Sequence, residues 1–186
     1  MLSNNKHLRA LLTLNTFFVF GATLLGPLYA VFVKDIGGNI LTIGWSFAVY
    51  MVILGLAAYA TGKLGDKIKE REYLLGLGYL FRGFGFFGYV FTQNSFHLLF
   101  VQIILGLGEA FGNPAFKAIF SEHLDEGKYS SEWGIWDALY SVAVGISAMT
   151  GAFIVSIFGF DTLFVTMGSI SFLSFIIILL LPRELL

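Results

Sequence analysis

The chain has no cysteine, only three prolines and few charged residues, which make up 12% of its 186 positions. The absence of cysteine excludes disulfide bonds, cysteine-ligated metal sites and thiol catalysis. Soluble domains carry about 25% charged residues, and half that share is too little to coat a globule of this size. The net charge of −1 provides no basic surface for nucleic acid, so we expect no nucleic-acid partner.

Apolar residues dominate what is present: 57% of the chain is hydrophobic and 17% is aromatic. A helix that spans a bilayer needs about 20 mainly apolar residues, and the connections between the apolar runs are too short to hold a second domain. We therefore expect an all-α, multi-pass protein of the cell membrane, with a single domain over residues 1–186 and the lipid bilayer as its surroundings. The six expected helices cover about 10–33, 40–61, 73–91, 96–120, 133–158 and 162–181.

The basic residues predict the orientation of these helices. Eight of them lie before the first helix, in the loops 62–72 and 121–132, and after the last helix, whereas Lys34 stands alone on the opposite side. Because basic loops remain on the cytoplasmic side, both termini are expected to be cytoplasmic.

The second and fifth expected helices share an internal similarity at an offset of 90 residues. A Pro followed two residues later by an aromatic residue, at Pro27 and again at Pro114, gives a second similarity between the first and fourth helices. Chance in a chain rich in glycine and aromatics is the alternative. Because the second copy begins three helices after the first, a true repeat would be inverted, consisting of two three-helix units that enter the membrane from opposite sides, as in several transporter folds. The matched pairs are Gly44 and Gly134, Ala48 and Ala138, Tyr50 and Tyr140, Val52 and Val142, and Gly55 and Gly145.

Arg82, Glu109 and Asp137 fall inside three of the expected helices. Each would cost at least about 2.5–3.5 kcal/mol near the centre of a bilayer. They are therefore expected to face the interior of the bundle, with Arg82 paired to one of the two acids. A single ion pair that fixes helix register is the structural alternative. Two acids competing for one arginine would leave one of them protonatable, which favours solute or proton handling.

Further polar residues extend this candidate site. Asn113 and Gln102 share one face of the fourth helix with Glu109, and Asn15 and Tyr29 mark the first helix. No metal-ligand spacing, nucleophile motif or phosphate-binding loop is present, so we expect neither an enzyme nor a cofactor or metal. The candidate substrate or coupling residues are Arg82, Glu109, Asn113, Asp137, Asn15, Gln102 and Tyr29.

Residues 62–71 read GKLGDKIKER. This segment resembles the loop between helices two and three of the major facilitator superfamily. The positions that conform are Gly62, Leu64, Asp66, Lys67 and Arg71, whereas Lys69 and Glu70 depart from the pattern. The resemblance implies that Asp66 caps a helix across the interface between two halves. It also implies that Arg71 pairs with an acid near the inner end of the fourth helix, for which Glu122 is the candidate.

Two other motifs of that superfamily are incomplete. The helix-four motif keeps Gly106 and Gly108 but has Gln102 where the superfamily has Arg, a residue associated with proton coupling. The helix-five antiporter motif survives only as a remnant without Pro in residues 147–152. We therefore do not expect an antiporter.

The resemblance covers the chain but only half of a usual twelve-helix member. It implies a secondary active transporter of a small molecule or ion. The two acids inside the expected helices make protons a candidate coupling ion. Two copies in a parallel homodimer would rebuild the full arrangement. The alternative is a non-transporting truncated or accessory half that pairs with a second six-helix polypeptide. The sequence does not identify the substrate, because the same fold transports many different solutes.

Overall fold

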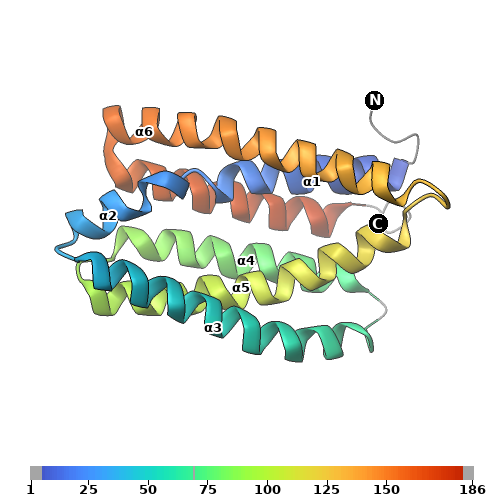
Figure 1. Cartoon of the computed structure of the whole chain (residues 1–186), viewed down its shortest axis with the longest axis horizontal. Helices are drawn as coiled ribbons and strands as arrows, with labels where there is room; N and C mark the ends of the chain where they lie inside the picture. The colour runs from blue at the N-terminus through green and yellow to red at the C-terminus, as the bar shows by residue number, and fades with distance from the viewer. Residues whose placement is uncertain (1–5, 69, 182–186) are drawn as a thin grey trace.

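The computed structural model describes residues 6–68 and 70–181. This part of the chain is mainly helical and contains no strand, which confirms the expected all-helical class (Figure 1). Lys69 and Arg183, two of the basic residues behind the predicted orientation, lie outside the described residues. The elements are α1 (Lys6–Ala22), the 3₁₀ helix η1 (Gly26–Leu28), α2 (Tyr29–Asp35), α3 (Ile40–Gly65), α4 (Arg71–Val90), α5 (Ser95–Glu122) and α6 (Tyr129–Leu180).

The helix α6 consists of two arms that meet at Gly159. This glycine has φ 80° and ψ 177°, a conformation that residues with a Cβ rarely adopt. The chain reverses there, and the two arms run side by side in opposite directions (Figure 1). The first arm, residues 129–158, begins four residues earlier than expected, and the second arm covers residues 160–180.

The first expected helix, over 10–33, corresponds to one candidate span over 6–35 that is interrupted near its middle. α1 ends at Ala22, and the chain passes through a 3₁₀ turn containing Pro27 before it resumes as α2. Proline has no N–H to donate and fits the first turn of a helix, so Pro27 begins a new helical segment. The second helix, in contrast, is longer than expected and ends at Gly65, so that Gly62 and Leu64 lie on α3.

Among the residues that the structure describes, four helical segments are long and apolar enough to cross a membrane: 6–35, 40–65, 95–122 and 129–180, the last of which contains both arms of α6. α4 is not among them, although it is 20 residues long. It packs against α5 and α6 and carries Arg82 near its middle. One face of α4 is therefore buried against α5 and α6, whereas its other face exposes Leu77 and Phe84.

Glycines bring α4 and α5 into backbone contact. A Cβ atom added to Gly78 would lie 2.5 Å from the Cα of Gly112 and 2.9 Å from the carbonyl oxygen of Gly108. Small residues allow such close approach between helices in lipid, where van der Waals packing replaces the hydrophobic effect as the driving force. The contact fixes the distance between the helices that carry Arg82 and Glu109.

Pro114 lies inside α5, and a residue of α3 compensates for it. Because Pro114 has no N–H, the carbonyl of Ala110 one turn earlier lacks its helical donor. The hydroxyl of Thr61 donates to this carbonyl at 2.5 Å, and Thr61 is buried. In a membrane such a carbonyl has no water to bond, so this hydrogen bond joins α3 to α5.

Two helical surfaces remain uncovered. Ser46 and Thr61 are the only buried residues within the 26 residues of α3, whose exposed side chains include Trp45 and Leu56. The first arm of α6 likewise exposes Val142, Met149 and others. A Cβ added at any of four glycines on these helices would meet no atom within 4 Å; they are Gly44, Gly55, Gly134 and Gly145. We call these two surfaces the open faces.

The proline compensation yields a test. Thr61→Val keeps the shape of the side chain but leaves the Ala110 carbonyl without a donor, so we expect a loss of stability of about 1–3 kcal/mol. Pro114→Ala supplies an N–H to the same carbonyl, so Thr61→Val should cost about 1 kcal/mol less in that background. Denaturant unfolding in mixed micelles measures both effects, and equal losses in the two backgrounds would contradict the account.

Candidate functional site

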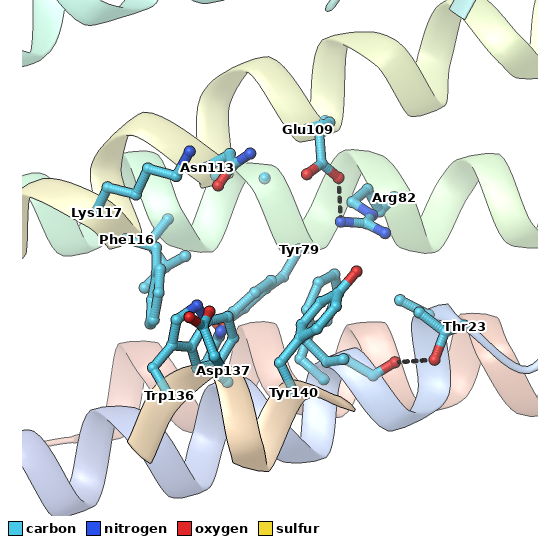
Figure 2. A pocket seen from close by; sticks show the side chains of 18 of the residues that line it. Thr23, Tyr79, Arg82, Glu109, Asn113, Phe116, Lys117, Trp136, Asp137 and Tyr140 are labelled. Atoms are coloured by element: carbon cyan, nitrogen blue, oxygen red, sulfur yellow. Dashed lines mark hydrogen bonds and ion pairs between the residues drawn. The ribbon is translucent and has the colours of Figure 1, made fainter. Parts of the chain in front are cut away.

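A cavity of about 480 Å³ lies inside the bundle (Figure 2). α1, α4, α5 and the first arm of α6 form its walls, and Tyr50 of α3 also contributes. Such a volume is typical of small-molecule sites. Five of the residues predicted from the sequence line it, namely Asn15, Arg82, Glu109, Asn113 and Asp137.

Arg82 of α4 and Glu109 of α5 form an ion pair in the wall of the cavity (Figure 2). The side chains are only 20% and 19% exposed. The guanidinium carbon also lies 4.7 Å from the centre of the Phe18 ring, a distance that permits a cation–π contact. The expected pairing of Arg82 is therefore present, with Glu109 as the partner.

The other predicted acid, Asp137, takes no part in this pair. Asp137 projects from the first arm of α6 toward the cavity, and Lys117 of α5 also lines it (Figure 2). Within the described part of the chain neither side chain forms an ion pair or a hydrogen bond. The cavity thus holds four charged groups, of which two neutralise each other and two do not.

Asn15 lines the cavity and is also tied to its wall. The Tyr79 hydroxyl donates to Asn15 Oδ1 at 3.0 Å, and both residues are buried. The Tyr79 ring packs on Phe18 with centroids 4.1 Å apart. This contact holds α1 against α4 beside the Arg82 guanidinium.

The two remaining predicted residues, Tyr29 and Gln102, meet in a smaller cavity of about 190 Å³. Gln102 Nε2 donates to the Tyr29 hydroxyl at 2.7 Å and to the Tyr89 hydroxyl at 3.2 Å. The Tyr29 hydroxyl in turn donates to Ser46 Oγ at 2.6 Å. Arg82 and Tyr50 line both cavities. The network therefore connects α2, α3, α4 and α5 next to the larger cavity.

The loop motif lies at one end of the bundle. Arg71, the first residue of α4, forms the expected ion pair with Glu122, the last residue of α5. Arg71 Nε also donates to the Gly65 carbonyl at 3.4 Å. Gly62 and Asp66 line a small cavity of about 110 Å³ together with Arg71, whereas Leu64 and Lys67 are exposed. Within the described residues the Asp66 carboxylate has no hydrogen-bond partner.

The connection between α5 and α6 lies at the same end. Lys128 Nζ and Asp125 Oδ2 are 2.9 Å apart, and this hydrogen bond raises the pKa of the exposed Lys128. Glu132, which is buried, accepts a hydrogen bond from the Asp125 backbone N–H at 2.8 Å. The connection is thus ordered by hydrogen bonds that its own charged groups form.

Sequence reasoning missed the aromatic walls of the site. Tyr50, Trp136 and Tyr140 line the cavity, and the Tyr50 hydroxyl lies beside the Glu109 carboxylate. A signal was available, because Tyr50 and Tyr140 are one of the pairs matched at an offset of 90 residues. In the sequence alone, that pair indicates only a repeat.

The central ion pair yields a test by double-mutant cycle. Arg82→Gln and Glu109→Gln each leave the opposite charge unpaired among apolar neighbours, so each should cost about 1–3 kcal/mol of stability. The double variant should be at least about 1 kcal/mol more stable than the sum of the two losses predicts. The exposed pair Arg71 and Glu122 is the control and should show a coupling of about 0–1 kcal/mol. Additive losses at Arg82 and Glu109 would contradict their pairing.

Comparison with known proteins agrees with this geometry. The sequence model of the Major Facilitator Superfamily matches residues 11–185. A Bacillus subtilis (strain 168) protein named uncharacterized MFS-type transporter YitZ is 27% identical over 162 residues, which cover 83% of this chain and 94% of that protein. The Methanocaldococcus jannaschii uncharacterized MFS-type transporter MJ1560 is 23% identical over 159 residues, which cover 86% of this chain but 41% of that protein.

The chain therefore spans nearly the whole of one relative and about two-fifths of the other. The match to the superfamily shows that the chain is an integral membrane transporter of small solutes and not an enzyme. This chain, with its charged cavity inside an apolar helical bundle, belongs to the Major Facilitator Superfamily.

Proposed function

We propose that the chain is one six-helix half of a secondary active transporter that moves a small solute by alternating access. The observation that carries this proposal is the cavity, which is lined by Arg82, Glu109, Lys117 and Asp137 in a largely apolar bundle. Arg82 and Glu109 are mostly buried, whereas Lys117 and Asp137 are exposed in the single chain. Ionisable residues within a membrane are costly and typically mark a substrate or ion pathway.

The six crossings would be the segment from α1 to α2, then α3, α4, α5 and the two arms of α6. α1 begins and α6 ends at the same end of the bundle (Figure 1), as an even number of crossings requires. Lys63, Lys67, Arg71 and Lys128 are at this end as well, so the positive-inside rule puts it in the cytoplasm. The cell membrane is the proposed location.

The working unit would be a parallel homodimer. The open faces on α3 and the first arm of α6 are apolar and rich in glycines whose side-chain positions have no neighbouring atoms. Small residues at such positions let helices of two units approach closely. A twofold axis along the membrane normal would bring the α3 of one copy against the first arm of α6 of the other. The cavity would then lie between the two copies.

The inverted repeat is also part of the proposal. Tyr50 and Tyr140 occupy matched positions and both line the cavity. Val52 and Val142, also matched, are exposed to similar extents, 58% and 61%. Equal surroundings at matched positions support a three-plus-three arrangement in which α3 and the first arm of α6 have equivalent roles.

Transport would proceed by rocking of the two bundles around the cavity. The Arg71–Glu122 pair and the Asp66 carboxylate lie where the inner ends of two copies would meet, so they would form contacts that differ between the two states. Asp137, which has no ion-pair partner within the described residues, is the candidate for proton coupling, together with Glu109. Asn113, Asn15, Gln102 and Tyr29 would shape the solute pathway.

Uptake by the purified chain in proteoliposomes tests the proposal. With an imposed pH gradient, we expect accumulation of one class of solute from a broad panel. Asp137→Asn or Glu109→Gln should remove the response to the gradient, because the amide cannot exchange a proton. Asp161→Asn is the matched control and should respond like the wild type, because Asp161 lies near the start of the second arm of α6, at the other end of the bundle.

Two results would count against parts of this account. An unchanged response in both cavity variants would contradict proton coupling. The absence of uptake for every solute would contradict transport by the chain alone and favour an accessory half that requires a second six-helix polypeptide.

A further inference from the structure

We propose that the solute is a zwitterion of the amino-acid type, with its cationic group held at Asp137 and its anionic group at Lys117. This inference rests on the proposed function and names the substrate class of the same cavity. It follows from the charge balance of the cavity and from the side chains that surround each unpaired charge.

The paired and unpaired charges that line the cavity favour a solute that carries one positive and one negative group. Arg82 and Glu109 neutralise each other, whereas Lys117 and Asp137 have no ion-pair partner within the described residues. Both side chains are exposed in the single chain, and a charge that faces lipid or a partner helix without a counter-charge is unfavourable in a membrane. A solute with one positive and one negative group neutralises both residues at once. A solute with a single charge leaves one of them unpaired.

The surroundings of Asp137 are suited to an ammonium group. Trp136 and Tyr140 lie on either side of Asp137 in the sequence, and their ring centroids are 5.6 Å apart. All three residues line the cavity (Figure 2). A carboxylate next to aromatic faces is a favourable site for an organic cation, because the rings add cation–π attraction to the ion pair.

The surroundings of Lys117 are suited to a carboxylate. Asn113 lies one helical turn earlier on α5, on the same face, and both side chains line the cavity from that helix (Figure 2). The lysine ammonium and the asparagine amide nitrogen are both hydrogen-bond donors. Together they offer a charge-assisted donor and a neutral donor for the two oxygens of one carboxylate.

The remaining wall would hold the body of the solute. Phe116 lies between Lys117 and Asp137 in the view of Figure 2, and Tyr140 lines the cavity on the other side of Asp137. The Phe18 ring lies against the Arg82 guanidinium. A volume of about 480 Å³ exceeds what the charged groups alone require. The site would therefore accept zwitterions with apolar side chains.

Matched sets of probes test the proposal on the purified full chain. Each set contains a zwitterion, the amine without its carboxylate and the acid without its amine. The sets are alanine with ethylamine and propionate, leucine with isoamylamine and 4-methylpentanoate, and phenylalanine with phenethylamine and 3-phenylpropionate. In at least one set we expect the zwitterion to bind about tenfold or more tightly than both analogues by calorimetry.

Two variants assign the two ends. Lys117→Gln should remove the preference for the zwitterion over the amine, and Asp137→Asn should remove the preference over the acid. Lys128→Gln and Asp161→Asn carry the same changes outside the cavity and should retain both preferences. The melting temperature of each variant in detergent verifies that it is folded.

The outcomes separate this inference from the proposed function. An analogue with one charge that binds as tightly as its zwitterion in every set overturns the inference, as does a preference that survives both cavity variants. Uptake of another solute class, with no binding of any zwitterion, overturns the inference and leaves the transport function intact. No uptake of any solute overturns the proposed function as well.

Discussion

The ion pair between Arg82 and Glu109 is the constraint on which the rest of the site depends. A charge among apolar helices is tolerated only with a partner, so this pair fixes α4 relative to α5. Gly78, Gly108 and Gly112 allow the backbones of these helices to touch, which brings the two side chains within reach. With one cation and one acid committed to each other, Lys117 and Asp137 are left to face the cavity.

The sequence predicted much of the fold, because membrane helices follow from composition. Long apolar runs, few charges and an asymmetric distribution of basic residues are local or additive signals. The boundaries were harder to predict. The first helix breaks where Pro27 removes a donor, and the two arms of α6 join at Gly159 without a loop. Pro114 does not break α5, because Thr61 of a different helix bonds the freed carbonyl, and no local pattern reveals that partner.

The candidate site was predicted in part for the same reason. Charged residues inside apolar runs are visible in a sequence, so Arg82, Glu109 and Asp137 could be identified. Which acid pairs with the arginine depends on the rotation and spacing of α4, α5 and α6, which the sequence does not specify. The aromatic wall was missed because Tyr50 and Trp136 look like ordinary membrane residues. Gln102 and Tyr29 meet each other in a hydrogen-bond network beside the main cavity.

Disulfide crosslinking between copies is the most direct test of whether two copies work together through the open faces. Leu64 on α3 and Ser131 on the first arm of α6 are both exposed, and the natural chain has no cysteine to interfere. Two differently tagged copies, one Leu64→Cys and one Ser131→Cys, would be expressed together and oxidised in membranes. Phe84→Cys with Val165→Cys, on outward surfaces of α4 and the second arm of α6, is the control pair. The account predicts a product carrying both tags for the first pair and none for the control. Absence of that product, or equal crosslinking of both pairs, would contradict it.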